Sequence, residues 1–424
     1  MKVGIYTLGC KVNTYESEYV MSLFKDRGYT ISSFDDICDV YVINTCTVTN
    51  QSDSKSRKII NQAIRKNPDS CVVAMGCFIE ANKDIQIEGV DVLIGSKNKS
   101  KIVDLVEEYF KTKKQIKSLY SDIGNEFENM EIKTFEGRTR AFVKIQDGCE
   151  NFCSYCIIPY VRGKCCSKDK ETVIEEITSL VKNGYKEIVL TGIHTGNYGK
   201  DLNISFASLL REIVNIEGLY RLRISSIEVT ELNDEVLSII ESSNVIVDHL
   251  HIPLQAGSDE ILKLMNRKYD TKYFEEIINK IRKIRLNISI STDVIVGFPM
   301  ETDELFQESY DFCKKMRFSK IHVFPYSIRK GTPASKFPNQ VDGKVKKERA
   351  RMLIDLSCQL EEEYMKKFIN SELDVLIEQY KDGYSYGHTS NYLLVKIAKK
   401  YNSEDVVKVK ISKVEYPYCI CLVD

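Results

Sequence analysis

The sequence of 424 residues lacks any apolar run approaching the length needed to cross a membrane, and it has no internal repeat or low-complexity tract. Its formal net charge is only -1, so no overall positive field attracts nucleic acid, and any RNA contact must use local patches. The first residues, MKVGIYTLGC, hold too short an apolar stretch for a signal peptide. We therefore expect a cytoplasmic protein with no membrane contact.

Cysteine, in contrast, is abundant, with 14 residues in a chain whose 43% hydrophobic content is ordinary for an enzyme of two or three domains. Thiols stay reduced in a cytoplasmic compartment, so this surplus favours metal or redox chemistry over disulfides. Three of the cysteines, Cys149, Cys153 and Cys156, have the spacing C-x3-C-x2-C directly after an apolar run. We call them the compact triplet.

The compact triplet has the pattern of an iron–sulfur site. Three thiolates can hold a four-iron, four-sulfur cluster and leave one iron without a protein ligand, where chemistry can occur. Structural zinc usually takes four ligands in two separated pairs, which fits this triplet poorly. Cys165 and Cys166 are the nearest candidates for a fourth ligand, but they lie beyond Pro159 and Gly163. The other alternative is three unconnected buried thiols.

The first part of the chain alternates short apolar strands with helical stretches, which is typical of a doubly wound α/β domain. We expect strands at 3–8, 40–44 and 72–75, with helices beginning at Tyr15 and Ser52. A polar, lysine-rich stretch follows. The expected boundaries are therefore an N-terminal domain at 1–112 and a linker at 113–134.

The middle of the chain, 135–366, repeats strand-like and helical segments. Repetition without a seventh and eighth strand predicts an open, partial (β/α)6 barrel, in which the loops after the strands carry the site. The compact triplet follows the first of these strands. The six expected strands are 141–146, 187–191, 221–225, 249–254, 289–296 and 320–325.

The last residues, 367–424, differ in character, because short runs of β-branched and aromatic residues replace the strand and helix units. They predict a small antiparallel β-barrel. The expected strands are 373–378, 392–397, 406–411 and 418–423.

A second set of cysteines, the strand-end triplet, consists of Cys10, Cys46 and Cys77. They are far apart in the sequence, yet each lies one or two residues beyond a predicted parallel strand. The C-terminal ends of such strands form one edge of the sheet, where ligands gather, so these thiols can converge. Gly9 and Gly76 allow the backbone to turn sharply beside them. The alternative is that these cysteines are merely buried.

The remaining cysteines serve as a comparison. Cys38 and Cys71 precede their strands, so we expect them at the opposite edge of the sheet, where they bind nothing. Cys313 and Cys358 lie in helical stretches and are expected in the core. Cys419 and Cys421 alternate onto one strand face, which suggests either a metal pair or, more simply, thiols in the core of the last barrel.

Polar residues near the expected barrel strands are further candidates. His249 and His251 point to one face of the fourth strand, and they are interpreted as core or solvated histidines, with a catalytic or substrate role for His251 as the alternative. Glu228, Glu231 and Asp293 lie near strand ends and could touch ribose or amino groups. For the two glutamates, an ordinary surface position is the simpler interpretation.

Two stretches are candidates for RNA contact. Residues 336–351 carry six basic and two acidic residues, which can track a phosphate backbone or form a solvated helix face. The last barrel is not basic overall, so RNA binding there requires lysines gathered on one side with Tyr384, Tyr386 and Tyr392.

Taken together, the chain resembles the radical S-adenosylmethionine (SAM) methylthiotransferases over essentially its whole length. The resemblance implies a methylthiotransferase domain, a radical SAM core and a C-terminal TRAM domain. It implies that Cys149, Cys153 and Cys156 hold a 4Fe-4S cluster whose open iron binds SAM. It also implies that Cys10, Cys46 and Cys77 hold an auxiliary 4Fe-4S cluster.

The same resemblance suggests contacts for SAM. Tyr155 matches the aromatic residue that usually backs the SAM adenine in radical SAM enzymes. Thr191 and Gly192 lie where the second strand meets the methionine end of SAM. Gly297 and Pro299 follow the fifth strand, near the nucleoside. No residue is assigned a catalytic role by this comparison.

The activity that the resemblance implies uses two SAM molecules. One methylates a sulfur of the auxiliary cluster, and the second is cleaved to a 5′-deoxyadenosyl radical that removes hydrogen from the substrate. The implied partners are a tRNA substrate and an electron donor such as a flavodoxin or ferredoxin-like protein. The sulfur donor is unknown.

Within the family, residues 9–13 (GCKVN) and 44–49 (NTCTVT) are most similar to the MtaB type, which modifies threonylcarbamoyladenosine beside the tRNA anticodon. The type acting on isopentenyladenosine usually has Gln-Met in place of Lys11-Val12, and the type acting on a ribosomal-protein aspartate usually has Pro-Lys there. Ala256 and Cys165-Cys166 depart from the family pattern. A non-enzymatic alternative is an iron–sulfur scaffold that binds RNA.

Overall fold

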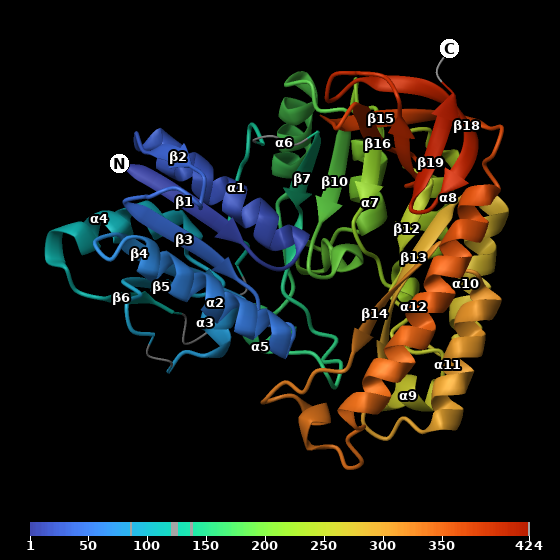
Figure 1. Cartoon of the computed structure of the whole chain (residues 1–424), viewed down its shortest axis with the longest axis horizontal. Helices are drawn as coiled ribbons and strands as arrows, with labels where there is room; N and C mark the ends of the chain where they lie inside the picture. Colours follow the sequence, from blue (N-terminus) through green and yellow to red (C-terminus); the bar gives the residue numbers. More distant parts are fainter. Residues whose placement is uncertain (85–86, 120–125, 136–138, 423–424) are drawn as a thin grey trace.

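The computed structural model describes residues 1–84, 87–119, 126–135 and 139–422, and it divides into three parts (Figure 1). An N-terminal α/β part lies at one side, a central partial barrel follows, and a small closed barrel completes the chain. Within the described residues, no helix combines the length and the apolar character that a membrane crossing requires.

The N-terminal part is built on one six-stranded parallel sheet, with the strand order β2-β1-β3-β4-β5-β6. Side chains alternate between its two faces, so Val40 and Val42 pack on one side and Tyr41 and Ile43 on the other. The strands are β1 (Lys2–Thr7), β2 (Thr30–Ser32), β3 (Val40–Thr45), β4 (Cys71–Gly76), β5 (Val92–Ile94) and β6 (Ile116–Ser118).

Helices cover both faces of this sheet, as a doubly wound domain requires. Helices α1 (Lys11–Asp26) and α4 (Ile102–Thr112) pack on the first face, and α2 (Asn50–Lys66) and α3 (Cys77–Ala81) pack on the second. The three long strands and the helices α1 and α2 confirm the pattern predicted from sequence. The three-residue strands β2, β5 and β6 were not predicted, because each is too short to show an alternating pattern.

The lysine-rich stretch is not a linker over its whole length, because it contains strand β6. Ile116–Ser118 pairs in parallel with β5 and forms the edge of the sheet, where polar side chains such as Lys117 can stay in solvent. The stretch therefore belongs to the N-terminal sheet up to this strand. Residues 120–125 of the expected linker lie outside the described residues.

The central part consists of six parallel strands in chain order, which confirms the predicted partial barrel. They form two three-stranded ladders, β11-β10-β7 and β12-β13-β14, joined by a bridge between Leu222 and Ile246. The strands are β7 (Arg140–Lys144), β10 (Glu187–Thr191), β11 (Arg221–Ile224), β12 (His249–His251), β13 (Ser289–Val296) and β14 (Lys320–Pro325).

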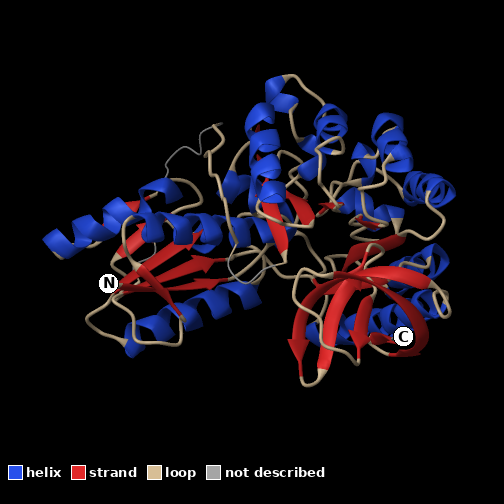
Figure 2. Cartoon of the chain, turned by 90° about the horizontal axis from the view of Figure 1, so that it is seen from above, coloured by secondary structure: helices blue, strands red, loops and turns tan. Residues whose placement is uncertain are grey.

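Helices surround the outside of these strands and bury a single large apolar core against them (Figure 2). A short pair, β8 (Gln146–Asp147) and β9 (Cys166–Ser167), encloses the loop that carries the compact triplet. The helices are α5 (Ile158–Arg162), α6 (Lys170–Lys182), α7 (Phe206–Ile213), α8 (Asp234–Ser242), α9 (Asp259–Leu264), α10 (Thr271–Ile284), α11 (Asp303–Met316) and α12 (Gly343–Lys366).

The C-terminal part is a closed five-stranded barrel with the order β15-β16-β17-β19-β18. Its pairs are antiparallel except for β17 and β19, which run parallel. The predicted list missed β16, whose sequence YSYGHT is polar and contains Gly387. Val423 of the last expected strand lies outside the described residues. The strands are β15 (Glu372–Lys381), β16 (Tyr384–Thr389), β17 (Leu394–Ile397), β18 (Val406–Glu415) and β19 (Tyr418–Leu422).

Candidate active site

The compact triplet lies on a loop that closes on itself directly after β8. The backbone N–H of Cys149 donates to the carbonyl of Gly163 at 3.0 Å, so the loop begins and ends at one point. Gly148 has a φ of +73°, and a Cβ on it would lie 1.9 Å from the carbonyl oxygen of Lys164. Only glycine permits this closure. The three thiols are thereby held together at the carboxyl end of the first ladder.

The electrostatics of the compact triplet fit a cationic group. Burial raises the pKa of Cys156 to about 12, and the charges of Cys153 and Cys149 act in the same direction. Burial likewise raises the pKa of Cys153, while Arg267 opposes that effect. Thiolates that lie so near to one another repel each other, unless cations such as the irons of a cluster neutralise their charge. Among the described residues, no group of three such ligands could hold a single metal ion. Thiols that bind different irons of one cluster need not meet at one point.

Arg267 contacts the compact triplet, and the sequence analysis did not identify it. Its Nη1 lies 3.2 Å from the Sγ of Cys153, its Nε donates to the hydroxyl of Tyr269 at 3.2 Å, and its Nη2 pairs with Glu228. Glu228 is therefore not an ordinary surface charge, because it balances a buried guanidinium. No motif marks Arg267, since it lies more than a hundred residues from the cysteine that it contacts.

His194 contacts the other end of the triplet. Its Nδ1 lies 3.7 Å from the Sγ of Cys149, and its Nε2 pairs with Glu231. Burial opposes the charged imidazole, but hydrogen bonds with Cys149, Cys165 and Glu231 raise the pKa of His194 to about 12. The surface interpretation of Glu231 is thus also wrong. The carboxylate is nearly buried and orients the histidine.

The residues predicted to contact SAM lie around this loop. The ring of Tyr155 meets that of Phe298 edge-on at 6.5 Å, which brings the turn of Gly297 and Pro299 to the compact triplet. At the end of β10, Thr191 is buried, and a Cβ on Gly192 would lie 3.1 Å from Oε1 of Gln146. The same oxygen accepts the N–H of His194 at 2.7 Å. Their contact with SAM itself stays a prediction.

The strand-end triplet converges as the topology predicted. Cys10, Cys46 and Cys77 follow β1, β3 and β4, which are neighbours in the sheet. Desolvation by the surrounding protein atoms raises the pKa of each thiol. The charge of Cys46 raises the pKa of Cys10 further, and that of Cys77 acts on Cys46 in the same way. Cys46 and Cys77 are buried, whereas Cys10 is exposed. This set is therefore closed on one side and accessible on the other.

The comparison cysteines lie where they were predicted to lie, except Cys358, which was expected in the core. Cys71 begins β4, and Cys38 precedes β3, so both are at the opposite edge of the sheet. Cys419 and Cys421 are buried in the core of the C-terminal barrel, and Cys313 is buried in the central core. Cys358 is only half-buried, because it lies on the outer side of α12 beneath Tyr416.

Gly76 provides a test of the strand-end site. It has a φ of +99° and a ψ of -159°, a region that non-glycine residues avoid, and a Cβ on it would lie 2.7 Å from Oδ1 of Asn44. We expect Gly76→Ala to displace Cys77, at a cost of about 1 to 3 kcal/mol, and to lower the iron content of the reconstituted protein. Iron analysis and thermal unfolding measure both effects.

A matched control for this prediction is Gly28→Ala. Gly28 also has a positive φ, of +83°, but a Cβ on it would meet nothing within 4 Å. It should lose stability without losing iron. Full iron content in Gly76→Ala would show that the close approach at this glycine does not shape the site.

The two triplets face each other across the junction of the first two parts. Helix α5 follows the compact triplet directly and packs against α3, which begins at Cys77. From α5, Arg162 reaches the N-terminal part, where its Nε lies 3.3 Å from the Sγ of Cys77. Its Nη atoms bind Glu16 at 2.8 Å and Asn13 at 2.8 Å.

Glu16 and Asp147 make this junction a buried charge network. Arg162, Lys144 and Lys99 all approach the carboxylate of Glu16, and Lys144 and Arg162 also bind Asp147. Despite burial, these cations lower the pKa of Glu16 to about 2 and hold that of Asp147 below its ordinary range. Both carboxylates are therefore charged, and the two triplets are held in a fixed relation.

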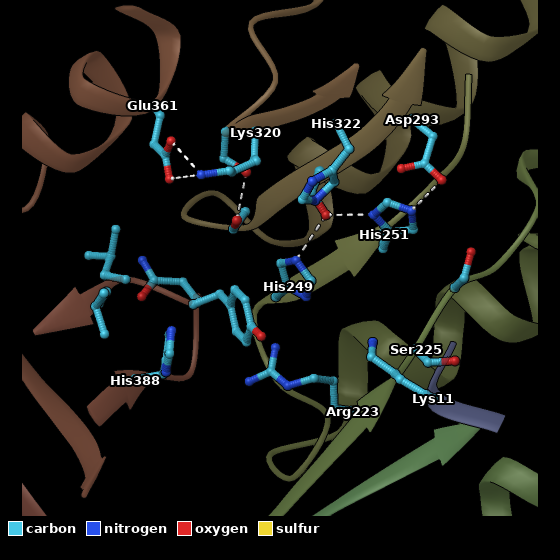
Figure 3. A pocket seen from close by; sticks show the side chains of 18 of the residues that line it. Lys11, Arg223, Ser225, His249, His251, Asp293, Lys320, His322, Glu361 and His388 are labelled. Carbon is cyan, nitrogen blue, oxygen red and sulfur yellow. Dashed lines mark hydrogen bonds and ion pairs between the residues drawn. The ribbon is translucent and has the colours of Figure 1, made fainter. Parts of the chain in front are cut away.

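A cavity of about 790 Å³ opens beside Cys10, where all three parts of the chain meet. The N-terminal part contributes Cys10 and Lys11, and the barrel strands β11 to β14 contribute inward-facing polar side chains (Figure 3). The C-terminal barrel adds His388 and Tyr392. The volume is in the range of small-molecule sites.

Both histidines of β12 line this cavity, so they are neither simple core residues nor fully solvated. His249 Nε2 and His251 Nδ1 meet the hydroxyl of Ser291 at 3.1 and 2.9 Å, which confirms that they share a face. His251 Nε2 also lies 3.3 Å from Asp293. Burial, assisted by Arg223, keeps the pKa of His249 well below its ordinary value.

The folded chain has the architecture of a radical SAM enzyme, with the thiols at the carboxyl end of a partial barrel. Residues 143–313 match the family described as the radical SAM superfamily, and residues 2–95 match the uncharacterized protein family UPF0004. A solved radical SAM methyltransferase, TsrM from Kitasatospora setae with cobalamin and a 4Fe-4S cluster bound, superposes with a TM-score of 0.57. It is 14% identical, covers 78% of this chain and 73% of that chain, and shows the fold alone.

Relatives with curated names narrow the class. The threonylcarbamoyladenosine tRNA methylthiotransferase MtaB of Bacillus subtilis is 45% identical over 98% of this chain and 95% of its own length. The MtaB of Aquifex aeolicus is 41% identical over 89% of this chain and 93% of its own length. The tRNA-2-methylthio-N(6)-dimethylallyladenosine synthase of Natranaerobius thermophilus is 36% identical over 88% and 84%.

This chain belongs to the radical SAM tRNA methylthiotransferases, a family of tRNA-modifying enzymes. Membership means that it uses SAM and two 4Fe-4S clusters. The alternative of a non-enzymatic iron–sulfur scaffold is thereby excluded. The names of the relatives span two nucleoside substrates, so the family alone leaves the particular nucleoside open.

Proposed function

We propose that the protein inserts a methylthio group at C2 of N6-threonylcarbamoyladenosine beside the anticodon of tRNA. The observation that carries this choice of substrate is the 45% identity, over nearly the whole chain, to a relative named for that nucleoside. The sequence of residues 9–13 supports it, because the MtaB type carries Lys-Val at this point. The substrate tRNA would place the activity in the cytoplasm.

In this proposal each triplet holds one cluster. Cys149, Cys153 and Cys156 hold the cluster that binds SAM, and Cys10, Cys46 and Cys77 hold the auxiliary cluster beside the cavity. When bound, SAM and the clusters supply the radical, the sulfur and the methyl group. At the substrate, the C2–H bond would be replaced by a bond from C2 to the methylthio sulfur, and the bound SAM and clusters would take up the hydrogen and the electron released.

The protein side chains then have positioning roles. Tyr155, Thr191, Gly192, Gly297 and Pro299 would contact SAM beside the compact triplet. Arg267 and His194 lie against its thiols at Cys153 and Cys149 and stabilise their negative charge. Cys10, the exposed residue of the strand-end triplet, would present the auxiliary cluster to the cavity, where the adenine would lie.

The C-terminal barrel would bind the RNA backbone. Lys396 lies over the ring of Tyr384 at 4.0 Å and near Tyr418 at 5.8 Å, and Tyr386 lies 5.6 Å from Tyr418. This cluster of one lysine and three aromatic rings supports RNA binding at this side of the barrel. Tyr392, which was expected in the same patch, lines the cavity instead. An electron donor such as a flavodoxin or ferredoxin-like protein would complete the set of partners.

The basic stretch at 336–351 offers fewer cations for contact with RNA than its composition suggested. Arg349 is buried and pairs with Glu301 and Asp303, each at 2.7 Å, so it anchors α12 and cannot reach a phosphate. Four cations remain exposed to solvent, namely Lys336, Lys344, Lys347 and Arg351.

Isopentenyladenosine in tRNA is the second candidate substrate, because two relatives named dimethylallyladenosine synthase are 36% and 35% identical to this chain. Nucleoside mass spectrometry on tRNA from cells with and without the gene separates the two. We expect the methylthio derivative of threonylcarbamoyladenosine to disappear with the gene and to return with a plasmid copy. Loss of the methylthio derivative of isopentenyladenosine instead would reject the proposed substrate.

A further inference from the structure

Arg223 is a buried cation with unused hydrogen-bonding capacity at the wall of the cavity. It is 2% exposed, its Nε and Nη2 donate to Glu187, and its Nη1 has no hydrogen-bond partner in the described part of the chain. Glu187 is also approached by Arg140 and Arg221, so one carboxylate serves three guanidinium groups. A buried charged donor without a partner is costly, and a ligand would relieve that cost.

Lys11 lies beside Arg223 in the same cavity, although the two residues come from different parts of the chain (Figure 3). Lys11 is the first residue of α1 and is exposed toward the cavity. No acidic side chain within the described residues pairs with it. The two carboxylates that line the cavity are engaged elsewhere, Asp293 by His251 and Glu361 by Lys320. The cavity therefore has an excess of positive charge at this wall.

Tyr392 gives the same wall an aromatic surface. Its ring stacks on His249 at 4.7 Å and on His388 at 4.6 Å, with interplanar angles of 25° and 24°. The guanidinium of Arg223 lies 4.6 Å from the centre of the same ring. Nδ1 of His249 is buried without a hydrogen-bond partner among the described residues. Stacked rings beside unpaired polar atoms suit a planar base that carries a polar substituent.

The position of this wall relative to Cys10 constrains what can bind. Cys10 directly precedes Lys11, and both line the cavity. In adenine, C2 and the carbon that carries N6 flank the same ring nitrogen, so a group attached at N6 extends from the edge that also presents C2. An anion at the end of that substituent can reach Lys11 while C2 faces Cys10.

We propose that Lys11 and Arg223 form a subsite that binds the carboxylate of the threonylcarbamoyl substituent, and that this subsite selects this nucleoside over one with an apolar substituent at N6. The inference rests on the proposed function and deepens it by naming the recognised group. A phosphate of the RNA backbone shares the same chemistry as an anion. The aromatic rings of Tyr392, His249 and His388 beside the two cations favour the carboxylate of a bound nucleoside over a backbone phosphate.

The test measures binding of anticodon stem-loops to the reconstituted full-length protein by fluorescence anisotropy. Four RNAs differ only at the target adenosine, which carries a threonylcarbamoyl group, its methyl ester, an isopentenyl group or no substituent. For Lys11→Met we expect about 10-fold to 100-fold weaker binding of the threonylcarbamoyl RNA, as for loss of a hydrogen bond to a charged group. Binding of the other three RNAs should change less than 3-fold.

The methyl ester supplies an independent arm, because it removes the charge from the ligand and leaves the protein intact. We expect the wild-type protein to bind the ester as weakly as Lys11→Met binds the acid, with no further loss when the two changes are combined. Arg223→Lys should behave like Lys11→Met. If that variant fails to fold, Lys11→Met and the ester still decide the matter.

Lys396→Met is the matched control, since this lysine lies on the RNA-facing patch of the C-terminal barrel. This substitution should weaken the binding of all four RNAs by the same factor. If Lys11→Met weakens the binding of all four RNAs equally, the subsite binds a backbone phosphate and the inference is overturned. Unchanged binding of the threonylcarbamoyl RNA by Lys11→Met would also overturn it.

Failure of the inference is distinguishable from failure of the proposed function. If the wild-type protein methylthiolates the threonylcarbamoyl RNA while Lys11→Met binds it normally, only the subsite is rejected. If the wild-type protein binds and methylthiolates the isopentenyl RNA alone, the proposed substrate is wrong, and the inference falls with it.

Discussion

Cys46→Ala is expected to abolish methylthiolation while the protein still cleaves SAM to 5′-deoxyadenosine under reduction. Cys46 belongs to the strand-end triplet, which lies in a different part of the chain from the compact triplet. Loss of one thiolate ligand should remove the auxiliary cluster and leave the SAM-binding cluster in place. Chromatography of 5′-deoxyadenosine and mass spectrometry of the RNA nucleosides measure the two outcomes separately.

Two further variants complete this experiment. Cys153→Ala should abolish both activities, because Cys153 belongs to the compact triplet and without its cluster no SAM is cleaved. Cys71→Ala is the control, since Cys71 begins the strand that ends before Cys77 and is buried at the far edge of the sheet. It should retain both activities. A folded Cys46→Ala protein without SAM cleavage would contradict the division of roles between the triplets.

Arg162→Met is expected to cause the largest loss of stability. Arg162 is 1% exposed and bonds to Glu16, Asp147 and Asn13, so its removal leaves two buried carboxylates with fewer cations. Removing one partner of a buried ion pair typically costs about 3 to 5 kcal/mol. Because Lys144 and Lys99 remain, we expect a value near the lower end of that range. The thermal unfolding midpoint and urea unfolding of the cluster-free protein measure the effect.

The control for this prediction is an exposed ion pair of the same residue type. Arg27 bonds to Asp104 at 2.7 Å on the surface of the N-terminal part, and Arg27→Met should lower the unfolding midpoint far less than Arg162→Met. Arg162→Lys keeps the charge but cannot bond to Glu16, Asp147, Asn13 and Cys77 at once, so its loss of stability should fall between those of the two other variants. An unchanged unfolding midpoint in Arg162→Met would show that the network does not hold the two parts together.

The architecture could be predicted because its signals are local. Strand-like runs that recur between helical segments predicted the six barrel strands, and strand-end positions predicted the convergence of Cys10, Cys46 and Cys77, without any knowledge of distant contacts. Strand β16 was missed because it is polar and contains Gly387, where a Cβ would lie 2.1 Å from the carbonyl of Leu376. Its place in the barrel depends on packing against a neighbouring strand, and its own sequence gives little sign of it.

The charged residues of the site could not be predicted in the same way. Arg162 bonds to residues almost 150 positions earlier, and Arg267 contacts a cysteine 114 positions earlier. Glu228 and Glu231 were interpreted as surface residues because isolated acidic side chains usually are. Their burial follows from cationic partners that only the folded chain brings to them. Lys11 is similar, since its place opposite Arg223 depends on how two parts of the chain meet.

The attachment of the C-terminal barrel has a consequence for substrate choice. Arg221 donates to the backbone carbonyls of Asp374 and His388, and Arg140 pairs with Glu378. These arginines share Glu187 with Arg223, and Tyr392 of the same barrel rests on Arg223. The barrel that we propose to bind the RNA backbone is thus joined directly to the cavity wall that we propose to bind the modified base. A free nucleoside could not contact the C-terminal barrel, and it should therefore be modified far less efficiently than the same nucleoside within a folded anticodon arm.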